Sequence, residues 1–279
     1  MRRDFEEIAD ALLASCDIDI RRYDREFVTG ILSRRMKSLG YDAIDQYLME
    51  LPSHPIERSE LLAMLHNTYT DFYRDLVTTA VLERSILPAL VERRCGSERN
   101  SVRVWSAACS SGQEAYGIAM LLHDIIAARE CDCSFRVFAT DRNASVLDIA
   151  IKGRYEREKL GRLRVAQLDT FFTAHTDGYE VSHSLRTHLE FSLYDLFDPD
   201  SMCPPACIYG EFDVVLCSNV LLYYNERTRQ FVLEKLQRCL ARNGVLVTGE
   251  SEREIVTTSA LFKGFMPGLP IYTANTDRR

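Results

Sequence analysis

The stretch WSAACSSGQEAYGIAM, residues 105–120, is typical of a turn in which a buried strand passes into a helix beside a bound cofactor. A dinucleotide-binding turn uses three glycines so that the backbone can approach a pyrophosphate. Here only Gly112 precedes the helix, and serines stand where other glycines would be. The first helical turn then carries Glu114, whose carboxylate would repel a phosphate.

The same carboxylate would attract a cationic ligand that has no phosphate, such as the ammonium and sulfonium groups of S-adenosylmethionine. Glu114 could also do no more than complement the helix dipole. Asp141 directly follows the next expected strand, where an acid can accept hydrogen bonds from ribose hydroxyls or cap the helix that starts at Asn143. The two acids together favour a nucleoside cofactor with a positive charge.

Around this stretch, strand and helix patterns alternate along the chain. Strands are expected at 102–107, 135–140, 189–193, 212–218, 244–250 and 271–274. Helices are expected between them at 113–129, 143–153 and 225–240. The alternation predicts an α/β domain with a mostly parallel, doubly wound sheet, whose ligand lies beyond the carboxyl ends of the strands. A polar stretch at 171–188, with a turn at Asp177-Gly178, predicts a small inserted β-hairpin.

The first 66 residues have a different pattern, with no alternating strand. Apolar residues recur at helical spacing in 5–16, 24–39, 43–51 and 56–65, which predicts an all-α N-terminal domain. A long helical stretch, residues 76–95, leads from this domain to the first strand.

The bulk composition limits the class of protein. With 279 residues, a formal net charge of −7 and a pI near 5.5, the chain is acidic, which argues against general nucleic-acid binding. No apolar run approaches the roughly 20 residues that span a bilayer. Acidic residues interrupt the N-terminal apolar positions, so we expect an amphipathic helix there and no targeting signal.

The nine cysteines are an odd number and are scattered through apolar segments, which predicts reduced thiols in a cytosolic protein. Two closely spaced pairs, Cys131-Asp-Cys133 and Cys203-Pro-Pro-Ala-Cys207, lack the spacing of a zinc site. We therefore predict small buried or loop thiols and no metal.

Several of these segments, in this order, resemble the chemotaxis-receptor glutamate methyltransferases of the CheR family. The resemblance runs through RRM (34–36), TDFYRD (70–75), the stretch 105–120, ATDRNASVLDIAIKGRY (139–155), FDVVLCSNVLLYY (212–224) and GVLVTGESE (244–252). It implies a helical N-terminal domain at 1–68, a linker helix region at 69–95 and a Rossmann-like class I S-adenosylmethionine-dependent methyltransferase domain at 96–279 with the small β-insertion.

The resemblance also implies roles for individual residues. Arg74 and Tyr223 would lie at the reacting carboxylate, which the planar fork of an arginine can hold in two directions. The cofactor would contact Thr68, Thr70, Arg74, Ala108, Glu114, Asp141, Asp195, Leu196, Ser218 and Asn219. Arg74 could instead be a solvated charge at a helix end, and Tyr223 a packed aromatic. Four positions depart from the family: it usually has asparagine at Thr68 and arginine at Ser218, and its GEEP is here Gly112-Gln113-Glu114-Ala115.

The implied reaction is methyl transfer from S-adenosylmethionine to receptor glutamate side chains, which leaves S-adenosylhomocysteine. A glutamate with an ordinary pKa of about 4.3 is already an anion at neutral pH, so it needs no general base. The partner would be the cytoplasmic domain of a chemoreceptor or a related signalling protein, with no nucleic acid and no membrane insertion. Another methyltransferase substrate, or a module that binds cofactor without turnover, stays open.

Residues 24–39 carry one feature that their helical pattern does not explain. Arg34 falls opposite the apolar stripe, but Arg35 falls inside it. A charge in that position must meet an acid, extend to the stripe edge or open into a cleft. The sequence leaves open whether Arg34 and Arg35 bind an acidic substrate helix or whether Arg35 forms a structural ion pair.

Overall fold

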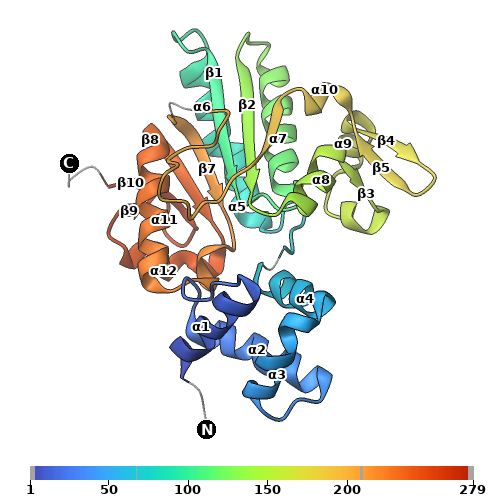
Figure 1. Ribbon diagram of the computed structural model, residues 1–279. Coiled ribbons are helices and arrows are strands. Elements are labelled where there is room, and N and C mark those ends of the chain that lie inside the picture. Colours follow the sequence, from blue (N-terminus) through green and yellow to red (C-terminus); the bar gives the residue numbers. More distant parts are fainter. Residues whose placement is uncertain (1–3, 67, 208–209, 276–279) are drawn as a thin grey trace. The chain divides into compact units, whose positions relative to one another are not determined.

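The computed structural model describes residues 4–66, 68–207 and 210–275. The chain forms two compact units, coloured along the sequence in Figure 1. The first, here called the helical unit, contains Met1–Thr68 and Leu221–Gln230. The second, here called the sheet unit, contains Tyr69–Val220 and Phe231–Arg279.

The helical unit contains four helices that agree with the expected segments: α1 (Phe5–Cys16), α2 (Arg25–Leu39), α3 (Ile44–Glu50) and α4 (Pro55–His66). Short polar side chains fix where they begin. Asp4 and Glu7 form a capping box on α1, and Asp24 accepts the N–H of Phe27 on α2. Gly40 ends α2 in the left-handed conformation.

The segment Leu221–Gln230 belongs to the helical unit, although the sequence analysis assigns it to the methyltransferase domain. The rings of Tyr224 and Tyr23 stack with centroids 4.9 Å apart. The N–H of Asp24 donates to the carbonyl of Tyr223 over 2.9 Å. These partners are separated by about two hundred positions of sequence, so no local pattern could reveal the contact.

The sheet unit is built on seven strands in the order β6-β2-β1-β7-β8-β10-β9. Five are parallel: β1 (Ser101–Ala107), β2 (Ser134–Asp141), β6 (Leu189–Leu193), β7 (Phe212–Cys217) and β8 (Leu240–Thr248). The last two pair antiparallel: β9 (Phe262–Gly264) and β10 (Ile271–Ala274). The mostly parallel, doubly wound sheet predicted from sequence is confirmed.

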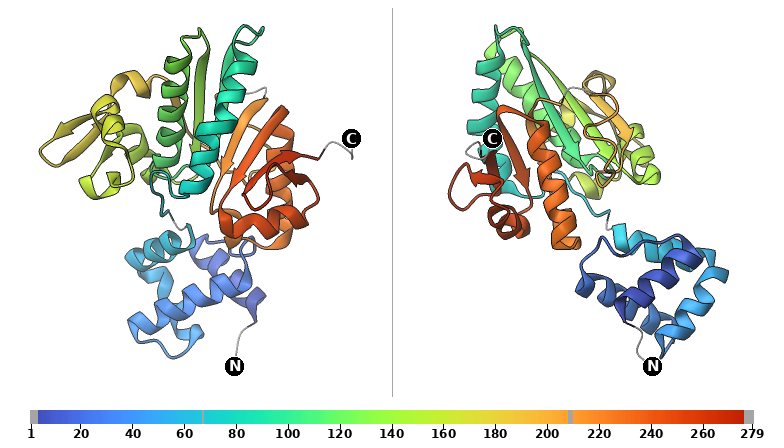
Figure 2. Two further views of the ribbon diagram at one scale, coloured as in Figure 1. Left: turned by 180° about the vertical axis from the view of Figure 1, so that it is seen from behind. Right: turned by 60° about the vertical axis from the view of Figure 1, so that its left-hand side comes forward.

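Helices cover both faces of this sheet, as the views in Figures 1 and 2 show. They are α5 (Leu76–Val81), α6 (Leu87–Arg94), α7 (Gln113–Arg129), α8 (Ala144–Lys152), α11 (Glu226–Cys239) and α12 (Arg253–Thr258). A π-helical turn, Leu82–Ile86, joins α5 to α6. Because both faces of the sheet are covered, β7 is buried along its whole length.

A second, three-stranded sheet lies between α8 and β6 in sequence, in the order β3-β5-β4. Strands β4 (Phe172–His175) and β5 (Gly178–Val181) form a hairpin within the stretch where one is expected. The helices α9 (Val165–Phe171) and α10 (His183–Arg186) flank this hairpin. The strand β3 (Arg154–Tyr155) was not expected, because two residues cannot display an alternating pattern.

Two further details differ from the sequence analysis. The strand expected at 244–250 begins at Leu240, because a register shift near Phe212 lets Leu240 pair with that residue. This strand, β8, ends at Thr248, and the following residues Glu250–Glu252 form a 3-10 turn. The edge strand β9 was also missed, since its three residues are too short for a pattern.

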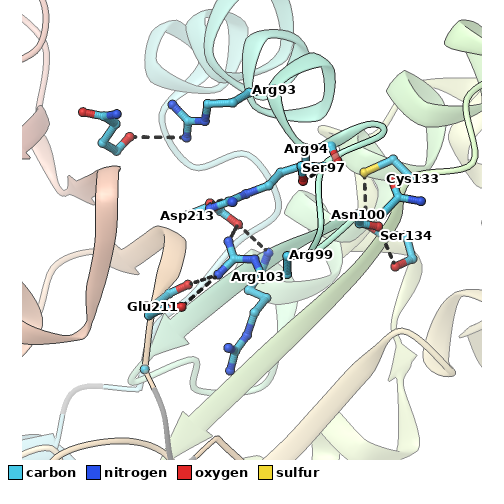
Figure 3. A network of polar contacts seen from close by, with 12 residues as sticks. Arg93, Arg94, Ser97, Arg99, Asn100, Arg103, Cys133, Ser134, Glu211 and Asp213 are labelled. Atoms are coloured by element: carbon cyan, nitrogen blue, oxygen red, sulfur yellow. Dashed lines mark hydrogen bonds and ion pairs between the residues drawn. The ribbon is translucent and has the colours of Figure 1, made fainter.

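Asp213, a fully buried residue in β7, holds the amino-terminal side of the sheet together (Figure 3). Its Oδ1 accepts from Arg94 Nε over 3.0 Å, and its Oδ2 accepts from Arg99 Nη2 over 2.5 Å. The backbone N–H of Arg103 in β1 also donates to Oδ2, over 3.0 Å. A buried charge is tolerated only when it is paired and hydrogen-bonded, and this carboxylate meets both conditions.

We expect Asp213→Ala to lower the free energy of unfolding by about 3–5 kcal/mol, because two arginines lose their buried partner. The matched control is Glu211→Ala, which removes a second acid 3.7 Å from the same Arg99. Glu211 is exposed, so its loss should change the free energy of unfolding by about 1 kcal/mol or less. Urea denaturation measures both values, and equal losses would contradict a central role for Asp213.

Candidate functional site

The turn between β1 and α7 is held in an unusual backbone conformation. Ala108, Ser110 and Gly112 all have positive φ, at 59°, 50° and 92°. Such angles are costly for residues other than glycine and persist where the surroundings impose them. A Cβ on Gly112 would lie 2.9 Å from the Cβ of Ala150, so helix α8 approaches too closely for any side chain there.

Asp141, the last residue of β2, fixes this turn from the neighbouring strand. Its Oδ2 accepts the N–H of Ser110 and its Oδ1 that of Asn143, each over 2.9 Å. Burial raises the pKa of Asp141, while these backbone hydrogen bonds oppose the rise. This buried carboxylate therefore ties the turn after β1 to the residues that follow β2. Asn143 itself caps α8 by accepting the N–H of Ser145.

Glu114, in the first turn of α7, is half-buried. Its carboxyl is hydrogen-bonded by residues from two other segments. Ser106 in β1 donates its hydroxyl to Glu114 Oε1 over 2.8 Å, and Ser218 beyond β7 also hydrogen-bonds this carboxyl. Burial raises the pKa of Glu114 most, and these two hydrogen bonds lower it. The charge of Glu252 raises it further and that of Arg74 lowers it, which brings both residues into the electrostatics of this site.

Glu252 is a site residue to which the sequence analysis gave no role. It is fully buried and binds three backbone N–H groups at the ends of β7 and β8. Its Oε2 accepts from Asn219 over 2.8 Å and from Gly249 over 2.7 Å, and its Oε1 accepts from Val220 over 2.7 Å. Asn219 has a φ of 61°, and a Cβ on Gly249 would lie 2.6 Å from its Nδ2. In the sequence, Glu252 could have been noticed as an acid in the segment 249–252, directly after a buried strand.

The segment that carries Arg74 is anchored at several points in the sheet unit. The ring of Phe72, fully buried, packs edge-on against Tyr155 at 5.3 Å between centroids. Gln167 donates to the hydroxyl of Tyr73 over 2.8 Å. Arg74 itself is exposed, with its guanidinium 5.3 Å from the ring centre of Tyr69.

Arg162 adds a clamp on the backbone of this segment. Its Nη1 donates to the carbonyl of Arg74 over 2.6 Å and to that of Tyr73 over 3.3 Å. Its Nε pairs with Asp71 Oδ2 at 3.2 Å. One guanidinium therefore fixes the position from which Arg74 projects, a role that sequence spacing could not indicate.

The loop after β6 carries two of the residues expected to contact the cofactor, Asp195 and Leu196. Asp195 is half-buried and accepts the N–H of Phe197 over 2.9 Å, while Leu196 is buried. The N–H of Tyr194 donates to the carbonyl of Asp141 over 3.0 Å, which joins this loop to the end of β2. The sheet unit thus gathers these residues at the carboxyl ends of its strands.

Four of the sequence-derived residues belong to the helical unit. Thr68 is half-buried, and the ring of Tyr223 lies 4.8 Å from that of Phe27. Arg34 is exposed. Arg35 instead binds both carboxylate oxygens of Glu57, which also accepts from Tyr47 over 2.7 Å. The hydrogen bond to Arg35 lowers the pKa of Glu57 despite burial. Of the roles considered for Arg35, the structure therefore supports a structural ion pair.

The parallel sheet, with acids in place of a glycine-rich phosphate loop at the ends of β1 and β2, defines a nucleoside-binding α/β domain of the methyltransferase class. Two family models match: "CheR methyltransferase, SAM binding domain" over residues 68–264 and "CheR methyltransferase, all-alpha domain" over residues 3–65. The chain belongs to the CheR methyltransferase family.

Curated relatives agree with this assignment over most of their length. The chain is 31% identical to a chemotaxis protein methyltransferase of Escherichia coli, over 89% of this chain and 83% of the relative. It is 29% identical to one of Salmonella typhimurium, over 98% and 91%. A third, from Borreliella burgdorferi, is 28% identical over 84% and 82%.

The residues of the sheet unit fit the cofactor of this family. Two of its acids, Glu114 and Asp141, are suited by their chemistry to a cofactor with cationic groups and hydroxyls. The chain is therefore an S-adenosylmethionine-dependent methyltransferase.

Among the residues that the structure describes, no three His, Cys, Asp or Glu side chains are grouped as metal ligands, and no helix is long and apolar enough to span a membrane.

We expect Gly112→Ala to lower the free energy of unfolding by about 1–3 kcal/mol, because the methyl group overlaps Ala150 at a positive φ. Gly30→Ala is the matched control, since a Cβ there meets no atom within 4 Å inside α2. It should stabilise the protein by about 0.5–1 kcal/mol. Thermal unfolding of both variants, followed by circular dichroism, distinguishes them. A Gly112→Ala variant as stable as Gly30→Ala would show that the turn is not constrained.

Proposed function

We propose that the chain transfers a methyl group from S-adenosylmethionine to glutamate side chains of a chemotaxis-type receptor, forming methyl esters. The observation that carries this proposal is Arg74, an exposed guanidinium whose backbone Arg162 fixes within the same unit that contains the half-buried acid Glu114. A planar guanidinium is suited to hold a carboxylate with two parallel hydrogen bonds. The relatives are named chemotaxis protein methyltransferases, which supports a receptor substrate in the cytoplasm.

When bound, S-adenosylmethionine supplies a methyl group activated by the positive charge of its sulfonium. The chain's task is then to bind, align and desolvate a nucleophile that is already ionised. Arg74 would orient the glutamate carboxylate, and the clamp from Arg162 would keep Arg74 in place. Because the glutamate side chain is already ionised, no residue of the chain would need to accept a proton from it.

The remaining residues would hold the cofactor. Glu114 would bind its amino-acid end and Asp141 its ribose, with Asp195 and Leu196 beside the adenine. Further contacts would come from Thr68, Thr70, Ala108, Ser218 and Asn219. Tyr223 would act near the transferred methyl group, although its packing against Phe27 equally suits an aromatic with only a structural role.

The reaction is tested with the purified chain, S-adenosylmethionine labelled in its methyl group and the cytoplasmic domain of a receptor from the same cell. We expect label on the receptor that mild base releases as methanol, because methyl esters hydrolyse readily. Base-stable label, or label only in small molecules, would overturn the receptor-glutamate proposal. Cofactor binding without any transfer would indicate a sensing module.

Two variants should separate alignment from cofactor binding. We expect Arg74→Ala to lower kcat by about 100-fold or more, since misalignment alone can cost this much. Its affinity for S-adenosylhomocysteine should change little. Asp141→Ala should weaken that affinity by about 10- to 100-fold, because a buried acceptor of hydroxyl groups is lost.

Arg74→Lys is the matched control, because it keeps the charge and loses the planar fork. It should remain as defective as Arg74→Ala if paired hydrogen bonds align the carboxylate. Calorimetry measures affinity and initial rates measure turnover. Near-normal turnover by Arg74→Ala would remove Arg74 from the mechanism.

The two neighbouring arginines of α2 should also behave differently. We propose that exposed Arg34 attracts an acidic substrate helix, so Arg34→Ala should raise KM for the receptor, most strongly at low salt, without changing the Tm. Arg35→Ala should lower the Tm, because Glu57 and its partner Tyr47 lose their cation. Unchanged KM in Arg34→Ala across salt concentrations would rule out this docking role.

A further inference from the structure

Two thiols of the sheet unit lie in direct contact, far from each other in sequence. Cys203 is in the segment between β6 and β7, and Cys239 is the last residue of α11. Their sulfur atoms are 3.4 Å apart. Cys239 is fully buried and its thiol also lies 3.3 Å from the carbonyl of Met202, the neighbour of Cys203. Both cysteines are reduced.

Cys203 has the properties of the more reactive thiol. It is half-buried, so a small reagent can reach it, whereas Cys239 has no exposed surface. The hydrogen bond with Cys239, together with the charges of Arg103 and Lys235, lowers the pKa of Cys203 below that of an ordinary thiol. The thiolate is the nucleophilic form of cysteine, so this shift favours reaction at Cys203.

We propose that Cys203 and Cys239 are a redox-active pair that hydroperoxides convert to a disulfide. The Cys203 thiolate attacks one oxygen of hydrogen peroxide, which forms a sulfenic acid and releases the other oxygen as water after protonation. The sulfur of Cys239 then attacks the sulfenic sulfur, and the hydroxyl leaves as a second water. Two thiols and one peroxide thus give one disulfide and two waters, and the peroxide is the two-electron oxidant.

A disulfide between Cys203 and Cys239 would link the loop before β7 to the end of α11. The sulfur atoms need to approach by roughly 1.4 Å to reach disulfide length, which side-chain rotation and a small loop shift can supply. The loop from Asp195 to Cys203 is already tied to α11, because Lys235 Nζ donates to the carbonyl of Asp198 over 2.5 Å. A disulfide would make this attachment covalent and would restrain the unfolded chain across 36 positions.

The chain provides a matched control in a second pair of neighbouring thiols, Cys95 and Cys131. Cys95 is exposed and hydrogen-bonds Cys131, but this bond raises the pKa of Cys95. Both pairs therefore have a hydrogen bond between their thiols, and Cys95 is more exposed than Cys203, while the pKa of Cys95 is shifted in the opposite direction. If thiol contact alone decided reactivity, the more exposed Cys95 would oxidise first.

The test treats the full chain with hydrogen peroxide at neutral pH, blocks the remaining thiols by alkylation and maps the peptides by mass spectrometry. We expect the crosslinked Cys203–Cys239 peptide to form before any Cys95–Cys131 peptide and to disappear on treatment with dithiothreitol. The oxidised chain should have a higher Tm than the reduced one. Cys203→Ser should abolish both effects, and Cys95→Ser should abolish neither.

Three outcomes would overturn the proposal. The first is faster crosslinking of Cys95 to Cys131. The second is accumulation of Cys203 as a sulfinic acid while Cys239 stays open to alkylation after unfolding. The third is a crosslink from Cys239 to Cys207 in the Cys203→Ser variant at the wild-type rate, which would make Cys207 the nucleophile. None of these readouts depends on methyl transfer, so they stand apart from the proposed activity.

Discussion

Two buried carboxylates hold the carboxyl edge of the sheet by binding backbone N–H groups. Asp141 joins the turn after β1 to the end of β2, and Glu252 joins the ends of β7 and β8. Each N–H that they satisfy lies in a segment with irregular backbone, where no ladder hydrogen bond is available. The site can therefore keep its positive φ angles without a glycine-rich loop. The charges of Glu252 and Arg74 both affect the pKa of Glu114, which lies at the same edge.

The sequence was most informative where a residue's role depends on its position at a strand end. Alternating strand and helix patterns predict the mostly parallel sheet, and Asp141 and Glu114 could be singled out because each lies shortly after a strand. Glu252 also follows a strand end, but the sequence could not give its partners, because Asn219 and Val220 lie more than 30 positions away along the chain. Short strands such as β3 were missed because pairing with a neighbour, and not local propensity, creates them.

Arg35 illustrates the same limit in a single residue. Its place inside the apolar stripe of α2 required a partner or an opening, but the periodicity could not choose between them. The choice depends on Glu57, which lies 22 positions away on α4. Ser218 is a similar case: the sequence marks only the loss of a charged residue usual in the family, whereas the structure gives its hydroxyl a hydrogen bond to Glu114. The role of the serine at position 218 could therefore be identified only from its contacts in the fold.

The discontinuous helical unit affects how such proteins can be recombined. Its core includes Leu221–Gln230, which reaches Tyr23 and Asp24 from the far end of the sequence. A chimera that exchanges only the first 68 residues with a relative would therefore place a foreign residue 23 against the ring of Tyr224. The natural boundary for exchange has two parts, because residue 23 and the segment 221–230 belong to the same core.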